Sequence, residues 1–240
     1  MEAETLGHHT SSRFDADLER LRGNVLQMGG LVERQLQRAL AGFLDADFNQ
    51  LVTVVREEQI VNELERSIDE DCGRILATRN PAASDLRLLI AILKANADLE
   101  RIGDEAEKIA AIGARRTGRD LPLDYFHELR HMGELVQSIV HDALDASARM
   151  DSRQALEVIR RDRKIDEEYD VLQRQSVTRM AEDPRGIRRT LDVMWAVRAL
   201  ERVGDHAKNI CEHVIYAVHG KDVRHVSLED AERQINESAN

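Results

Sequence analysis

The sequence predicts an all-α protein, built as two tandem, pseudo-symmetric three-helix bundles with six long helices. Aromatic residues make up only 3% of the chain and prolines number three, too few for a protein of many strands and tight turns. The strong helix formers Ala, Leu, Glu, Arg and Gln dominate instead. Six segments carry apolar residues at steps of three and four, and a block near the middle of the chain recurs in its second half.

Three helices are predicted in the first half. The first covers residues 14–43, with an apolar stripe at Leu18, Leu21, Val25, Met28 and Val32. The second covers residues 48–77. The third follows Asn80-Pro81, because an Asn side chain caps a helix and a proline fits its first turn. It extends to residue 112 along one apolar seam, formed by Leu88, Ile92, Ala95, Leu99, Ile102, Ala106 and Ile109.

Three further helices are predicted after a break at residues 117–122. The fourth covers residues 124–149, with apolar positions at Leu129, Met132, Leu135, Ile139 and Ala143. The fifth covers residues 152–180. The sixth follows Asp183-Pro184, the same start signal as the third helix, and ends near residue 218.

An internal repeat relates the two halves. Residues 99–109 read LERIGDEAEKI and residues 200–210 read LERVGDHAKNI, so seven of eleven positions are identical at an offset of 101. We therefore expect a flexible tail over residues 1–12, one bundle over 13–118, a second over 119–226, and a C-terminal tail over 227–240. One continuous six-helix domain is the alternative architecture.

Charge and cysteine content restrict the function. A formal net charge of −11 disfavours nucleic-acid binding, and the short basic runs at residues 160–164 and 185–189 are typical of solvated helix faces. No apolar run reaches about 18 residues, which argues against a membrane span. The first residues have no apolar signal region, and Cys72 and Cys211 form no CxxC motif. A cytoplasmic protein is the expectation.

Paired carboxylates on the third helix predict a metal site in the first half. Glu100 and Asp104 are four residues apart, so they lie on one helix face. The second helix offers Glu58 and Asn62 at the same spacing. Oxygen ligands from two helices suit magnesium, manganese or ferrous iron. Gly103 lies inside the helix, where glycine costs about 1 kcal/mol, and this suggests close approach of another backbone or a ligand.

The second half repeats this pattern. Glu201 and Asp205 match the carboxylates of the third helix, and Asp162 and Asp166 match Glu58 and Asn62 at an offset of 104. Because an amide replaces one carboxylate, the first site is expected to carry one negative charge fewer than the second.

Other interpretations of these residues stay open. The carboxylates could form an ordinary solvated face, with Arg101 and Arg202 as pairing partners. His127 and His131 have zinc-like spacing but no third ligand, so surface histidines are expected. The apolar outer face of the third helix at Leu86, Ile90 and Leu93 is of a kind that often forms a homodimer.

Several motifs resemble the PhoU family. The doubled E-R-[IV]-G-D block, RNPAASDLRLL at residues 79–89, ALDASARM at 143–150 and CEHVIYAVHGKDVRHV at 211–226 agree with that family in order and spacing. The resemblance extends from about residue 15 to 226. It implies two three-helix bundles that bind metal through E(D)-x-x-x-D motifs, here at Glu100, Asp104, Glu58, Glu201, Asp205, Asp162 and Asp166.

The resemblance also implies a function. PhoU proteins are negative regulators of the phosphate-starvation response, thought to connect the ATPase subunit of the phosphate ABC transporter, PstB, to the sensor histidine kinase PhoR. The expectation is therefore a non-enzymatic cytoplasmic adaptor that reaches the membrane only through partner proteins. Two alternatives remain, a metal-dependent phosphate-ester hydrolase that uses the same carboxylates and a structural bundle without metal.

Overall fold

Seven α-helices and one short 3-10 turn make up the computed structural model, which describes residues 11–79, 81, 83–115 and 123–238. The helices are α1 (Ser11–Asp45), α2 (Phe48–Arg79), α3 (Ala83–Arg115), α4 (Leu123–Arg149), α5 (Ser152–Glu182), α6 (Ile187–His219) and α7 (Leu228–Ser238), with η1 (Pro184–Gly186) before α6. The six predicted helices are therefore confirmed, each to within three residues at either end.

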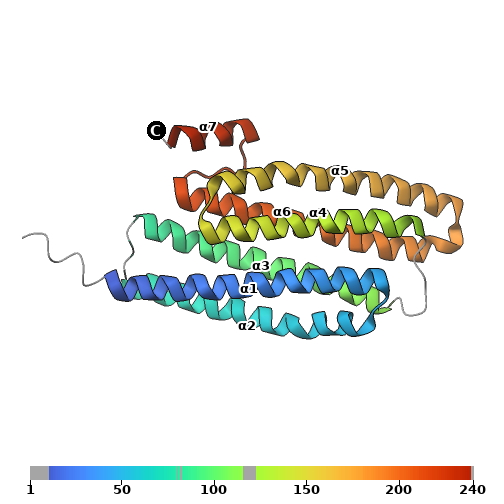
Figure 1. The fold of residues 1–240 in the computed structure, drawn as a ribbon, viewed down its shortest axis with the longest axis horizontal. Helices are drawn as coiled ribbons and strands as arrows, with labels where there is room; N and C mark the ends of the chain where they lie inside the picture. The colour runs from blue at the N-terminus through green and yellow to red at the C-terminus, as the bar shows by residue number, and fades with distance from the viewer. Residues whose placement is uncertain (1–10, 80, 82, 116–122, 239–240) are drawn as a thin grey trace, which may run out of the picture.

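Two three-helix bundles lie side by side with their long axes roughly aligned (Figure 1). Helices α1, α2 and α3 form the first bundle, and α4, α5 and α6 form the second. The most extensive contact between any two helices joins α3 to α6, and α1 also packs on α4. The tandem bundles are thus confirmed, and one continuous apolar core runs through both of them.

Local sequence sets several helix ends. Asp151 caps α5 by accepting hydrogen bonds from the backbone N–H groups of Arg153 and Gln154. Gly220 ends α6 in the left-handed region, at φ 69°, which glycine adopts without a Cβ clash. After Asp183, the Pro184 segment forms the 3-10 turn η1 before α6 begins, rather than the first turn of α6 itself. Asn80, the other predicted cap, lies outside the described residues.

A charge-reversed ion pair supports the duplication. Arg38 of α1 pairs with Glu57 of α2 in the first bundle. At an offset of 104 residues, Asp142 of α4 pairs with Arg161 of α5 in the second. The same two helix faces are therefore joined in both bundles, with the signs of the charges exchanged.

The expected C-terminal tail over residues 227–240 contains helix α7 instead, so that expectation was wrong. Ser227 caps α7 by accepting from the backbone N–H of Asp230 at 3.2 Å. Ala231 and Ile235, four residues apart, are buried and make α7 pack against α5 and α6. Arg160 Nε also donates to Glu232 Oε1 at 3.0 Å. The expected N-terminal tail falls mostly on residues 1–10, outside the described residues.

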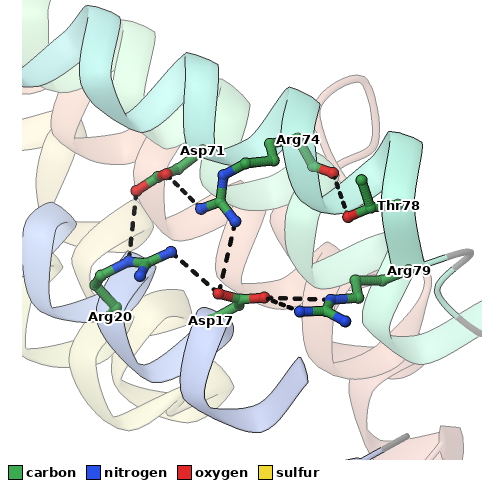
Figure 2. A network of polar contacts seen from close by, with 6 residues as sticks. All are labelled: Asp17, Arg20, Asp71, Arg74, Thr78 and Arg79. Atoms are coloured by element: carbon green, nitrogen blue, oxygen red, sulfur yellow. Dashed lines mark hydrogen bonds and ion pairs between the residues drawn. The ribbon is translucent and has the colours of Figure 1, made fainter. Parts of the chain in front are cut away.

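A polar network ties the start of α1 to the end of α2 (Figure 2). Asp17 Oδ2 accepts from Arg79 Nη2 at 2.9 Å, and Asp17 Oδ1 lies 3.0 Å from Arg20 Nη2 and 3.6 Å from Arg74 Nη1. The hydrogen bond from Arg79 is the main reason why the pKa of Asp17 is lowered. Arg79 opens the RNPAASDL segment, and its role there is to hold two helices together.

Among the described residues, no helix is long and apolar enough to cross a membrane.

Candidate metal centre

Glu58 lies against the backbone of α3 in the first carboxylate cluster. A Cβ atom placed on Gly103 would lie 3.0 Å from Glu58 Oε2 and 3.4 Å from Gln35 Oε1. The missing side chain therefore makes room for a carboxylate on a neighbouring helix. The atoms close to this glycine belong to side chains rather than to another backbone, so that part of the expectation was wrong, and the approach of a ligand stays a prediction.

Burial perturbs the acidity of this carboxylate strongly. Glu58 is only 5% exposed, and burial together with the negative charges of Asp104 and Glu107 raises its pKa to about 7. Gln35 Nε2 donates to Glu58 Oε2 at 3.3 Å, whereas Glu58 Oε1 has no hydrogen-bond partner among the described residues. A buried carboxylate with one unpaired oxygen beside other acids is a group that a cation would stabilise.

The remaining predicted residues of this cluster are less buried. Burial and the charge of Asp104 raise the pKa of Glu100, and the Arg101 Nε atom lies 3.4 Å from Glu100 Oε2. Asn62 is half-buried one turn after Glu58. Within the described part of the chain, its amide makes no hydrogen bond to these carboxylates. The structure thus groups Glu58, Glu100 and Asp104 electrostatically and leaves Asn62 at the edge.

The second cluster repeats this design with α5 and α6. Asp162 is 1% exposed, and a Cβ atom on Gly204 would lie 3.2 Å from its Oδ1 and 2.8 Å from Ile165 Cδ1. Burial raises the pKa of Asp162, with further contributions from Asp166 and Asp205. Burial and the charge of Asp205 likewise raise the pKa values of Asp166 and Glu201. All four predicted residues therefore belong to one electrostatically coupled group.

Lys208 distinguishes the second cluster from the first. Its Nζ lies 3.2 Å from Asp162 Oδ2, as an ion pair without hydrogen-bond geometry. The repeat offset of 101 places Glu107 at the equivalent position of the first cluster. Glu107 in place of a lysine makes the charge around the first cluster more negative, whereas Asn62 in place of an aspartate makes it less negative. The expected ranking of the two sites, which rests on the charge of the ligands alone, stays a prediction.

The arginines behave differently in the two clusters. Arg101 pairs with Glu100 as expected, but Arg202 reaches across to α3, where its Nε lies 3.1 Å from Glu105 Oε1. Arg198 takes the expected place of Arg202, because its Nη1 lies 2.7 Å from Glu201 Oε1. His127 and His131 are both exposed on α4, as predicted for surface histidines.

The donor set fits a hard divalent cation. Among the described residues, three carboxylate oxygens of the two clusters are buried without a hydrogen-bond partner, although Lys208 Nζ forms an ion pair with the second of them: Glu58 Oε1, Asp162 Oδ2 and Glu201 Oε2. Oxygen ligands of this kind suit magnesium, manganese and calcium. In the part of the chain that the structure describes, however, no three acidic, His or Cys side chains already converge tightly enough to hold an ion. Binding would therefore require the half-buried carboxylates to turn toward the buried ones.

Gln35, Glu107 and Lys208 were not predicted as site residues. The repeat itself could have revealed the last two, because aligning residues 99–109 with 200–210 places a glutamate opposite a lysine within the motif. No local pattern marks Gln35, which contributes from α1 through packing.

Comparison with known proteins identifies relatives over almost the full chain. A family model described as the PhoU domain matches twice, at residues 25–112 and 129–214. The chain is 50% identical over 238 residues to the phosphate-specific transport system accessory protein PhoU homolog of Pseudomonas putida, covering 98% of this chain and 92% of that protein. It is 41% identical to the phosphate-specific transport system accessory protein PhoU of Escherichia coli K12, covering 97% and 96%.

Solved structures agree with these matches. The crystal structure of PhoU from Pseudomonas aeruginosa superposes with a TM-score of 0.85 at 49% identity, covering 87% of this chain and all of that one. The phosphate transport system regulatory protein PhoU from Streptococcus pneumoniae gives a TM-score of 0.81 at 28% identity, covering 88% and 99%.

Proposed function

The chain belongs to the PhoU family, and on that premise we propose that it is a regulatory accessory protein of phosphate uptake. The observation that carries this proposal is the extent of the likeness: half of all residues are identical to a phosphate-transport accessory protein over 98% of the chain. Both halves also match the same domain model, so the likeness includes the duplicated architecture.

The finer proposal is an adaptor between two membrane systems. The chain would contact the PstB-like ATPase subunit of a phosphate transporter and a PhoR-like sensor kinase at the cytoplasmic side, and would hold the kinase inhibited when phosphate is plentiful. An adaptor shifts such a balance only through its difference in affinity for two partner states. Exposed apolar side chains on α5 and α6, at Val171, Val177, Ile187 and Leu191, offer surface for such contacts.

A bound divalent ion would support this role structurally. Magnesium, manganese or ferrous iron would supply a localised double positive charge at each cluster. In the first cluster Glu58, Glu100 and Asp104 would hold it, and in the second the ligands would be Asp162, Asp166, Glu201 and Asp205. The carboxylates of each cluster come from two helices, so an ion would cross-link α2 to α3 or α5 to α6 and remove their mutual repulsion.

A homodimer remains part of the proposal. Leu86 and Ile187 occupy equivalent positions in the repeat and are 39% and 38% exposed. The proposal is that these two positions contribute to a self-association surface. Sedimentation equilibrium of wild type and a Leu86→Glu variant measures whether association depends on this face.

Deleting the gene tests the regulatory role. Expression of phosphate-starvation genes should rise in high phosphate, and the wild-type gene should restore repression. Affinity purification from cells should recover the transporter ATPase and the sensor kinase. Unchanged expression in the deletion strain, together with no recovery of either partner, would contradict the adaptor role. Turnover of phosphate esters with manganese that is lost in Asp205→Asn would favour the hydrolase instead.

A further inference from the structure

A basic groove lies between the C-terminal half of α3 and the N-terminal half of α6. Its volume is about 560 Å³, within the range of small-molecule sites. Five cationic side chains and the indole of one tryptophan line it: Lys108, Arg115, Arg188, Arg198, Arg202 and Trp195. Among the residues that the structure describes, the acidic ones that line the same groove are Glu105 and Asp192. In a chain of net charge −11, this concentration of positive charge is unusual.

Part of this positive charge has no internal partner. Glu105 Oε1 lies 3.0 Å from Lys108 Nζ and 3.1 Å from Arg202 Nε, so one carboxylate serves two cations. Within the described residues, Arg115 and Arg188 form no ion pair, and both are exposed. These two exposed guanidinium groups are therefore available to an anion that enters the groove.

The contact between α3 and α6 has a second end, which the internal repeat makes equivalent to the basic groove. At that end, side chains of the protein itself fill the space. There Asp98 of α3 accepts hydrogen bonds from three α6 side chains, at 2.9 Å from His206, 3.0 Å from Asn209 and 3.0 Å from His213. The repeat offset of 101 places Ala199 at the position of Asp98 in the basic groove. A carboxylate therefore closes one end of the seam, and an alanine leaves the other end open.

The two ends of the α3–α6 contact also differ in how a cation and an aromatic ring are placed. At the closed end, Lys94 Nζ lies 5.6 Å from the centre of the Tyr216 ring. The equivalent positions in the groove are Trp195 for Lys94 and Arg115 for Tyr216, so the ring and the cation have exchanged helices. Among the described residues these two make no such contact, and Trp195 is 63% exposed. Trp195 of α6 and Arg115 of α3 both line the groove, so a ligand bound there could contact both side chains.

We propose that this groove binds a nucleoside polyphosphate. Arg115 and Arg188 would bind the phosphates, because the guanidinium fork matches phosphate oxygens in bidentate geometry. Trp195 would stack on the base, because an indole offers a flat apolar face to any nucleobase. The groove is distinct from the carboxylate clusters, and the inference does not depend on the transport role.

Trp195 is the only tryptophan in the chain, so its fluorescence reports on this groove alone. The full-length protein is titrated with ATP, adenosine and tripolyphosphate in the presence of EDTA, which keeps the carboxylate clusters free of metal. ATP should quench the fluorescence saturably, adenosine should do so far more weakly, and tripolyphosphate should compete with ATP. Increasing salt should weaken binding, since the attraction is largely between exposed charges.

Variants locate the site. Arg188→Ala and Arg115→Ala should each weaken ATP binding about tenfold or more, as expected for the loss of a charge-assisted hydrogen bond. Arg174→Ala changes an exposed arginine on α5 outside the groove and should bind like wild type. Equilibrium dialysis with labelled ATP extends the test to Trp195→Ala, which lacks the fluorophore. Circular dichroism melting checks that each variant is folded.

Three results would overturn the proposal. The first is an ATP titration that does not saturate below millimolar concentration. The second is equal binding by Arg188→Ala, Arg115→Ala and Arg174→Ala, which would place the nucleotide elsewhere. The third is a Glu-rich peptide that binds and depends on Arg188 while ATP does not bind, which would make the groove a docking surface for an acidic protein segment.

Discussion

Replacing Glu58 with glutamine should stabilise the metal-free protein while weakening its response to metal. Glu58 is buried beside Asp104 and Glu107, and its pKa is raised from 4.5 to about 7. A carboxyl group with a raised pKa in the folded state holds its proton more tightly there than in the unfolded chain. Stability is then complete below pH 4.5 and falls as the pH rises toward 7.

The size of this effect follows from the two pKa values. Each tenfold difference in proton affinity is worth about 1.4 kcal/mol, so the ionised carboxylate costs the fold about 3 kcal/mol above pH 7. Glutamine has the same shape without the charge, and its carbonyl oxygen can still accept from Gln35 Nε2, now 3.3 Å from Glu58 Oε2. Glu58→Gln should therefore raise the free energy of unfolding by about 3 kcal/mol at pH 8.

Urea denaturation in EDTA at pH 8 and pH 4.5 measures this difference. The gain should shrink below about 0.5 kcal/mol at pH 4.5, where the folded wild type keeps its proton. Glu63→Gln is the matched control, since Glu63 is exposed on the same helix and its substitution should change stability by less than about 0.5 kcal/mol. Equal stability of Glu58→Gln and wild type at pH 8, or a gain that persists unchanged at pH 4.5, would refute the reasoning.

Three further predictions concern packing, the seam between bundles and the thiols. Gly204→Ala should lower the free energy of unfolding by about 1 kcal/mol, because overpacking against Asp162 and Ile165 outweighs the gain in helix propensity. Gly73→Ala is the control: a Cβ atom there would have nothing within 4 Å, so this variant should raise the free energy of unfolding by about 1 kcal/mol in the same urea assay. Asp98→Ala should cost about 2 to 4 kcal/mol because the buried His213 and the half-buried His206 and Asn209 lose their hydrogen-bond partner, and a melting curve unchanged from wild type would contradict this. Cys72 and Cys211 are buried, and burial raises the pKa values of both thiols. A disulfide reagent should therefore label both cysteines only after denaturant is added. Fast labelling of the native protein would count against their burial.

The helices could be predicted from the sequence because their signals are local. Apolar residues at steps of three and four defined all six long helices, and the repeat in residues 99–109 and 200–210 indicated the duplication. Helix α7 was missed because it is short, and among its residues whose burial is described two buried positions, Ala231 and Ile235, mark its apolar face. Such a face is recognisable mainly once the surface that it covers is known.

The carboxylate clusters were predictable in part. The repeat aligned residues from two helices in each half, and the structure brings Glu58 close to Gly103 and Asp162 close to Gly204. The direction of Arg202 was not predictable, because its partner Glu105 belongs to the other bundle. The contacts of Asp98 were not predictable for the same reason, because its side chain in the first bundle is hydrogen-bonded to His206 and His213 of the second. Contacts within a repeat can be inferred from the repeat, whereas contacts between the two copies depend on how they pack.

Metal binding by chelator-stripped protein is the most direct test of the two-cluster account. Isothermal titration with manganese should show saturable binding, and elemental analysis after dialysis should recover the metal. A variant with Glu100→Gln, Asp104→Asn, Glu201→Gln and Asp205→Asn should lose this binding, whereas Glu63→Gln should keep it. No uptake by wild type at millimolar manganese, or equal uptake by the fourfold variant, would contradict the claim that these carboxylates converge on a divalent ion.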